Sequence, residues 1–339
     1  MVMTMTEIRK HYFLDKWVIV AEKRRARPKP TIVEKTAEAE LCFFCPGNER
    51  LTPPASLAYV LEGNELKKAV EQGDQRVKNW LIRCFPNKYP ALTPQAKLRR
   101  RNDWLKAMAA RGFHEVLVET PNHNADLDTI EEEQLALALS AIFERARHYA
   151  SQSFVKYISI FKNSGVAAGA SISHPHTQLA TLPFVPEEVA YELKALKRYE
   201  KDGVCALCEV VEKEKLSERV VFREHGYLVL SPWASIFPYE MWILPEKHLP
   251  TPFNLSNEEI SSLAKVLKRA FKALFRALGK VPYNLVYKIP PIGEYGFYHW
   301  RIEVYPRLSI HAGFELSTGV VINTVSPEKA AEDLRSCLS

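Results

Sequence analysis

The chain has 339 residues, a formal net charge of +6 and a sequence pI of about 8.8, so it is mildly basic. Hydrophobic residues contribute 47% and charged residues 25%, which is ordinary for a globular protein, and the length allows two domains or one domain of two similar halves. No apolar run approaches the roughly 18 residues of a membrane helix, and the N-terminus lacks the apolar segment of a secretion signal. These features predict a cytoplasmic protein without membrane contact.

Part of the positive charge lies in two short runs, Lys23–Arg27 and Lys97–Arg101. Such runs contact nucleic acid or form a solvated face. The solvated face is the simpler interpretation of the second run, and the first run has a more specific use that is given below.

The first half begins its predicted core with a Cys-x-x-Cys pair, Cys42 and Cys45. Six cysteines are too few for a disulfide framework in a chain of this size, and without a secretion signal the pair favours metal binding. A strand-like run that begins at Val116 ends close to His123, and an amphipathic pattern with an acidic start predicts a helix over about 130–150.

A loop of small residues, Asn163–Ser171, comes next and contains two glycines. Small residues let backbone N–H groups approach a phosphate closely, so the loop is a candidate phosphate cradle. Directly after it, alternation along a strand predicts that His174, His176 and Gln178 line one face.

The second half begins with a helical stretch from Glu187 to Glu200, and the join between the halves lies near residues 185–204. We therefore divide the chain into an N-terminal catalytic unit, residues 1–185, and a C-terminal unit, residues 186–339.

The C-terminal unit repeats the order of the first. A second Cys-x-x-Cys pair, Cys205 and Cys208, precedes a strand-like run from Trp242 that ends close to His248, and a helix is predicted over about 257–278. The sequence therefore predicts an α+β fold of two copies of one unit, each a mainly antiparallel sheet with helices.

The spacing of the histidines supports the repeat. His123 and His174 are 51 residues apart (174 − 123 = 51), and so are His248 and His299 (299 − 248 = 51). Each half thus offers two cysteines and two histidines, the four nitrogen and sulfur donors that zinc prefers in a tetrahedron. The predicted ligands are Cys42, Cys45, His123 and His174 in one site, and Cys205, Cys208, His248 and His299 in the other.

Because four protein ligands leave no open position, both predicted zinc ions are structural, two per chain. The alternative interpretation of either pair is ordinary buried thiols.

His176 is the predicted nucleophile. An imidazole attacks phosphorus at neutral pH, since its free pKa is about 6.5, and Gln178 is the second candidate catalytic residue because its amide can bind the ring or a phosphate oxygen. The second copy has Arg301 and Glu303 at the matching positions. It has lost the nucleophile, which predicts one active centre per pair of repeats.

These residues resemble the galactose-1-phosphate uridylyltransferase branch of the histidine-triad superfamily, over nearly the whole chain. Thr177 stands where many members have glycine. The segments that carry the resemblance are Asp15–Val20, Arg24–Pro28, Phe85–Tyr89, Phe161–Gly165, Ser171 and His174–Gln178, together with the zinc ligands.

The resemblance implies a double displacement in galactose metabolism, in which His176 takes UMP from UDP-glucose and passes it to galactose 1-phosphate. It further implies zinc as cofactor, a homodimer with shared active sites, nucleotide sugars and sugar 1-phosphates as partners, and no nucleic acid. The implied substrate-binding residues are Arg24, Arg27, Asn163 and Ser171 for phosphate, Asn87 and Lys88 for the nucleoside, and Glu315 for the hexose.

The C-terminal sequence departs from the best-known bacterial type. Its histidine-rich metal segment is replaced by His299–Pro306, and Ser309 stands where that type has a lysine. The stretch Gly313–Asn323 is more similar to archaeal and plant relatives, some of which are ADP-glucose phosphorylases. The alternative function is therefore a phosphorylase of the same chemistry, and the alternative from another class is a zinc-stabilised RNA-binding protein.

Overall fold

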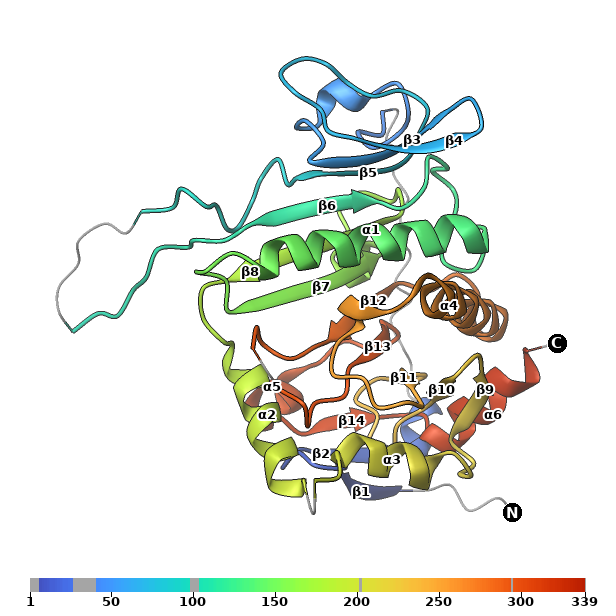
Figure 1. The fold of residues 1–339 in the computed structure, drawn as a ribbon. Coiled ribbons are helices and arrows are strands. Elements are labelled where there is room, and N and C mark those ends of the chain that lie inside the picture. The colour runs from blue at the N-terminus through green and yellow to red at the C-terminus, as the bar shows by residue number, and fades with distance from the viewer. Residues whose placement is uncertain (1–5, 27–40, 98–103, 201–202, 294, 339) are drawn as a thin grey trace.

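The computed structural model of the protein describes residues 6–26, 41–97, 104–200, 203–293 and 295–338 (Figure 1). Within these ranges no helix is long and apolar enough to cross a membrane. Arg27, one of the predicted phosphate ligands, lies outside the described residues.

A single large sheet of 11 antiparallel strands runs through the molecule. Its order is β4-β3-β5-β6-β8-β7 from the first half, followed by β12-β13-β11-β10-β9 from the second. The strands are β3 (Leu57–Glu62), β4 (Glu65–Ala69), β5 (Trp80–Pro86), β6 (His114–Val118), β7 (Tyr157–Ser164), β8 (His176–Leu182), β9 (Val220–Glu224), β10 (Tyr227–Leu230), β11 (Met241–Pro245), β12 (Tyr283–Lys288) and β13 (Arg301–Pro306).

The two halves meet at the middle of this sheet. Phe161 on β7 pairs with Gln178, and Val286 on β12 pairs with Glu303, so Phe161 and Val286 are counterparts. These two residues also pair with each other across the join. A pseudo-twofold axis therefore passes between β7 and β12, and the predicted α+β fold of two similar units is confirmed.

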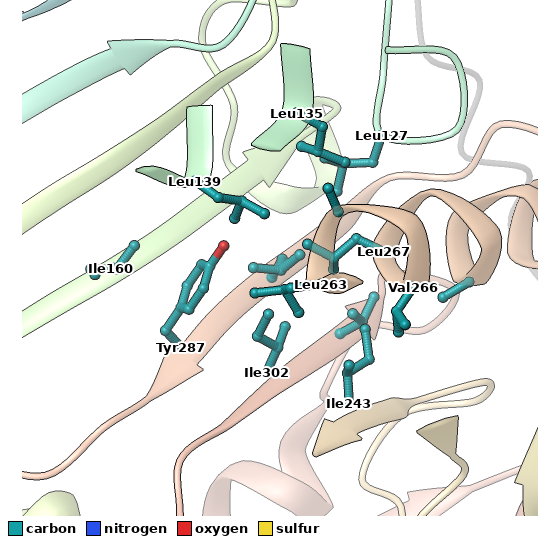
Figure 2. Close-up of a cluster of buried hydrophobic side chains, with 14 of the residues drawn as sticks. Leu127, Leu135, Leu139, Ile160, Ile243, Leu263, Val266, Leu267, Tyr287 and Ile302 are labelled. Atoms are coloured by element: carbon teal, nitrogen blue, oxygen red, sulfur yellow. The ribbon is translucent and has the colours of Figure 1, made fainter. Parts of the chain in front are cut away.

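Two long helices cover the same region of the sheet, α1 (Glu132–Ala150) and α4 (Asn257–Leu278), close to the predicted ranges. Figure 2 shows the core beneath them, where Leu139 of α1 and Leu267 of α4 lie among side chains from β7, β12, β13 and β11. Because one apolar cluster contains residues of both halves, each half completes the core of the other.

The two helices begin differently. Ser256 and Glu259 form a capping box at the start of α4, in which each side chain bonds the other residue's backbone N–H. At α1 the N-cap is Glu131, and its side chain makes no capping bond. The start of α1 is therefore set by packing more than by a cap.

A small second sheet joins the two ends of the chain. It contains β1 (Thr6–Lys10), β2 (Trp17–Ala21) and β14 (Val321–Asn323), and β14 runs parallel to β2. Phe13 and Leu14, between β1 and β2, pack in a core with residues of the second half. The remaining helices are α2 (Glu187–Tyr199), α3 (Ala206–Glu214), α5 (Gly313–Thr318) and α6 (Pro327–Ser336), with 3-10 turns η1 (Glu22–Ala26), η2 (Glu49–Leu51), η3 (Val166–Ala168) and η4 (Pro252–Asn254).

Candidate active site and metal sites

The structure brings the four predicted ligands of the first half together, within 4.8 Å of one another. Cys45 Sγ lies 3.4 Å from His123 Nδ1 and 3.6 Å from His174 Nδ1, and Cys42 Sγ lies 3.7 Å from His174 Nδ1. A tetrahedral zinc with ordinary bond lengths separates its sulfur and nitrogen ligands by about 3.6 Å. The donor set therefore fits zinc in both chemistry and spacing.

The Nε2 atoms of His123 and His174, which face away from the cysteines, also have hydrogen-bond partners. His174 Nε2 donates to the Thr120 carbonyl over 2.8 Å, and His123 Nε2 lies 3.2 Å from Ser173 Oγ. Such contacts orient a metal-binding ring and leave Nδ1 as the ligand atom. Burial lowers the pKa of His174 to about 4, so the ring is neutral, as a metal ligand must be.

The second half repeats this arrangement. Cys208 Sγ lies 3.2 Å from His248 Nδ1 and 3.4 Å from His299 Nδ1, and Cys205 completes the cluster. His248 Nε2 donates to the Gly296 carbonyl over 2.7 Å and His299 Nε2 to the Pro245 carbonyl over 2.8 Å. The same donor set, presented through the same ring nitrogens, also fits zinc.

His176 is the first residue of β8 and pairs with Val118 of β6. Its Nδ1–H donates to the carbonyl of His174 over 2.8 Å, which leaves the lone pair on Nε2. Burial lowers the pKa of His176, so the ring is neutral and nucleophilic near pH 7. The residue is 7% exposed, so its ring is largely shielded from solvent.

Phe44, between the two cysteines of the first metal site, packs edge-on against the His176 ring at 5.3 Å. The turn that carries the two cysteines therefore also contacts the ring of His176. This contact could not be predicted from the sequence, because metal binding places no requirement on the two residues within a Cys-x-x-Cys pair.

The opposite face of β8 is fixed by a buried ion pair. Thr177 Oγ1 donates to Glu119 Oε1 over 2.6 Å, and Lys162 Nζ lies 2.7 Å from Glu119 Oε2. All three side chains are buried. A glycine at position 177 would lack this bond, so Thr177 anchors the strand that carries the nucleophile.

Gln178 lies on the same face of β8 as His176 by strand alternation. Its Oε1 is 3.0 Å from Nε2 of His114, the first residue of β6. Asn87, a predicted nucleoside ligand, lies next to the same ring, with Nδ2 3.4 Å from His114 Nε2. The structure thus links Gln178 and Asn87 through His114, a residue that the sequence patterns did not single out.

The candidate phosphate loop turns tightly between β7 and β8. Gly165 and Gly169 have φ of 82° and 84°, a region that favours glycine, and η3 lies between them. Asn163 at the end of β7 accepts a 2.9 Å bond from Asn284, and Ser171 is exposed. The loop backbone is therefore placed directly before His176.

Three other predicted substrate residues lie apart from this group. Arg24 is exposed on η1, Lys88 donates to the Leu51 carbonyl over 3.4 Å, and Glu315 lies on α5 in the second half. Glu315 accepts from the Ala312 backbone N–H over 2.9 Å. Among the described residues, no recorded bond connects Arg24 or Glu315 with His176.

At the matching position of the second half, Arg301 is 1% exposed and bound on two sides. Its guanidinium lies 2.9 Å from Glu192 Oε1 on α2 and 2.6 Å from Glu303 Oε1 on β13. Lys288 also contacts Glu192, at 2.8 Å. These cations hold the pKa of Glu192 and Glu303 below the usual value despite burial, so the network is ionised.

Comparisons with known proteins extend over the whole chain. A family model described as a domain of unknown function (DUF4921) matches residues 122–339. The chain is 30% identical to an ADP-glucose phosphorylase of Arabidopsis thaliana, covering 97% of this chain and 92% of that protein. It is 31% identical to a galactose-1-phosphate uridylyltransferase of Thermotoga maritima, covering 98% of each.

The fold is similar to solved structures of the same kinds. A crystal structure of the Arabidopsis thaliana ADP-glucose phosphorylase with bound ADP-glucose superposes with a TM-score of 0.81 at 29% identity, covering 98% of both chains. A uridylyltransferase structure gives a TM-score of 0.76 at 28% identity, with the same coverage. The similarity therefore includes both halves of the chain.

Proposed function

The chain belongs to the galactose-1-phosphate uridylyltransferase family, and on that premise we propose that it moves UMP from UDP-glucose to galactose 1-phosphate through a covalent adduct on His176. The observation that carries the proposal is the bond from His176 Nδ1–H to the His174 carbonyl, which leaves a neutral ring with its lone pair on Nε2. The protein is then a nucleotidyltransferase with one active centre per chain.

In the first step, His176 Nε2 attacks the α-phosphorus of UDP-glucose. A P–N bond forms, the P–O bond to glucose 1-phosphate breaks, and glucose 1-phosphate leaves with the electron pair. The adduct is a uridylyl-imidazolium, whose Nδ1–H remains bonded to the His174 carbonyl. That carbonyl dipole stabilises the positive charge of the ring.

In the second step, a phosphate oxygen of galactose 1-phosphate attacks the same phosphorus. The P–N bond breaks, UDP-galactose leaves, and neutral His176 is restored. Neither step requires a proton on the leaving atom, because glucose 1-phosphate in the first step and the His176 imidazole in the second are both weakly basic. Gln178, Asn163, Ser171 and the loop backbone would bind the phosphate charge, which is the main requirement of this chemistry.

Zinc would be held by the two Cys₂His₂ clusters, one ion in each half. With four protein ligands it would stabilise the fold and supply no open position to substrate. In the first half it would fix His174, and through the same strand and turn also His176 and Phe44.

The test of the nucleophile is covalent labelling. We expect UDP-glucose labelled in the α-phosphate to transfer label to the wild-type protein, and His176→Ala to abolish the labelling. His148→Ala, which changes an exposed histidine on α1, is the matched control and should label normally. Labelling of His176→Ala would place the nucleophile on another residue.

The second candidate is an ADP-glucose phosphorylase, which would transfer AMP to inorganic phosphate through the same histidine. It is supported by the likeness to the Arabidopsis thaliana enzyme over both chains and by the stretch Gly313–Asn323. UDP-glucose and ADP-glucose, each offered with galactose 1-phosphate or inorganic phosphate, separate the two functions. Release of ADP from ADP-glucose and phosphate alone would favour the phosphorylase.

A homodimer would explain the position of Glu315, which lies in the second half while the nucleophile lies in the first. We propose that a second copy supplies Glu315 to the hexose. Mixing His176→Ala with Glu315→Gln, each inactive alone, should restore about a quarter of the wild-type activity through mixed dimers. No recovery after the subunits have exchanged would place the acceptor site within one chain.

A further inference from the structure

We infer that His114 is a positioning residue, which sets the direction of the Gln178 amide for nucleotidyl transfer. The inference rests on the proposed function, since it concerns how the same site is organised. His114 is half-buried at the start of β6, and its ring lies between Gln178 on β8 and the loop that follows β5.

The backbone determines which ring nitrogen carries the proton. The N–H of Ala91 points at His114 Nδ1 over 3.4 Å. A backbone N–H is always a donor, so Nδ1 accepts and the proton of the neutral ring is on Nε2. The shorter contact, 3.0 Å from Nε2 to Gln178 Oε1, is then a bond in which His114 donates and Gln178 accepts.

This bond fixes which end of the Gln178 amide is available. With Oε1 bound to His114, the NH₂ group is the end left to meet a ligand. Phosphate oxygens accept and do not donate, so the reversed amide would present an oxygen lone pair to them. His114 therefore turns Gln178 into a donor on the face of β8 that carries His176.

The same ring is connected to the segment predicted to hold the nucleoside. The backbone N–H of Asn87 donates to the His114 carbonyl over 2.7 Å, and Asn87 Oδ1 accepts from the Tyr89 N–H over 2.8 Å. Asn87 Nδ2 then lies at the longer distance of 3.4 Å from His114 Nε2. Because Nε2–H and the Asn87 NH₂ group are both donors, this contact is not a hydrogen bond, and the segment is joined to His114 through the Asn87 backbone N–H.

The second half supplies an internal comparison. Val116 pairs with Gln178, and Trp242 pairs with Glu303, so the residues two positions earlier, His114 and Glu240, are counterparts. Where the nucleophile is absent, the His–Gln pair is replaced by two buried carboxylates, Glu240 and Glu303. Of these two counterpart pairs, only His114 and Gln178, beside the proposed nucleophile, can offer N–H donors to a phosphate.

The experiment compares His114→Phe, which keeps a ring but removes both nitrogens, with His114→Gln, whose side-chain NH₂ can replace Nε2–H. Single-turnover formation of the His176 adduct is measured with the nucleotide sugar that labels the wild-type protein. We expect His114→Phe to slow the step by about 10- to 100-fold, with less than about a threefold change in nucleotide-sugar affinity. His114→Gln should recover most of the rate.

A double-mutant cycle with Gln178→Ala tests whether His114 acts through Gln178. If it does, His114→Phe has no further effect on the adduct rate once Gln178 is replaced. A wild-type rate in His114→Phe, or equal slowing with and without Gln178, would overturn the inference while leaving the proposed function intact. Zinc content and the unfolding midpoint of each variant show whether it is folded, and His114→Gln supplies the comparison if His114→Phe is not.

A wild-type protein that forms no adduct with any nucleotide sugar would instead overturn the proposed function. The inference would then fail with it, for a different and recognisable reason.

Discussion

The two halves of the molecule place different chemistry at the same strand position. On β8, His176 has one nitrogen bound by a backbone carbonyl and the other left with a lone pair. On β13, the counterpart Arg301 is buried and bound by Glu192 and Glu303. On the proposed function, the same strand position therefore serves catalysis in one half and a buried ion-pair network in the other.

The side chains that pack over His176 and over Arg301 differ as well. The Arg301 guanidinium lies 4.6 Å from the Trp242 ring and 5.8 Å from the ring of Phe13, which precedes β2. Helix α2 closes the same position through Glu192. In the second half, Phe13 of the N-terminal segment and Glu192 of α2 therefore pack against Arg301, the counterpart of His176.

The largest effects are expected at the two candidate metal sites, one in each half. Cys42→Ala and Cys205→Ala should each release one zinc and lower the free energy of unfolding by up to ~10 kcal/mol, since metal binding is coupled to folding. Zinc analysis and denaturant unfolding measure both effects, and Cys337→Ser, outside both clusters, should leave two zinc ions per chain. Retention of both ions in Cys205→Ala would show that the second cluster is not a metal site.

The next effect separates the halves by activity. His176→Ala should lower turnover by on the order of 10⁶-fold, as loss of a covalent nucleophile does. Adding Arg301→His should not restore it, because Glu192 and Phe13 still fill that position and Glu240 stands at the position of His114. Steady-state assay of the two variants decides the point. Recovered turnover would mean that the nucleophile alone distinguishes the halves.

A smaller effect is expected from breaking the buried network of the second half. Arg301→Ala leaves Glu192 and Glu303 short of a cation in the interior, and we expect a loss of about 3–5 kcal/mol in the free energy of unfolding. Denaturant titration gives this value. The control is Lys213→Ala, which removes an exposed pair with Glu209 and should cost less than about 0.5 kcal/mol. Equal costs for the two variants would contradict the role given to the network.

The smallest effect is a pH dependence. Burial, followed by the charge of Glu303, raises the pKa of Glu240 to about 8. The folded protein therefore holds a proton that the unfolded chain releases above pH 4.5, and stability falls as the pH rises from 4.5 through 8. We expect a loss of about 2–3 kcal/mol between about pH 6 and 8.5.

Glu240→Gln, which cannot ionise, is the control and should be flatter over the same interval in unfolding measurements. A wild-type curve parallel to that of the variant would show that Glu240 is charged in the folded protein.

The sequence allowed the repeat, the two long helices and the clusters of cysteine and histidine to be predicted, because each depends on spacing within a few turns or on a strict internal match. The partner of β2 could not be predicted, since β14 lies about 300 residues away and is three residues long. His114 and Phe44 were missed for a related reason. Their roles come from rings that meet β8 from other segments, and nothing in their local sequence marks that meeting.

The shared middle of the sheet has a consequence for dividing the protein. If the chain were cut between the halves, each fragment would present a long apolar edge, β7 in one and β12 in the other, and the N-terminal fragment would also carry the partners of β14. An exposed edge strand has unpaired backbone N–H and C=O groups, which readily pair with another strand. The two pieces should therefore reassemble when co-expressed, which would make the molecule a natural candidate for a split reporter.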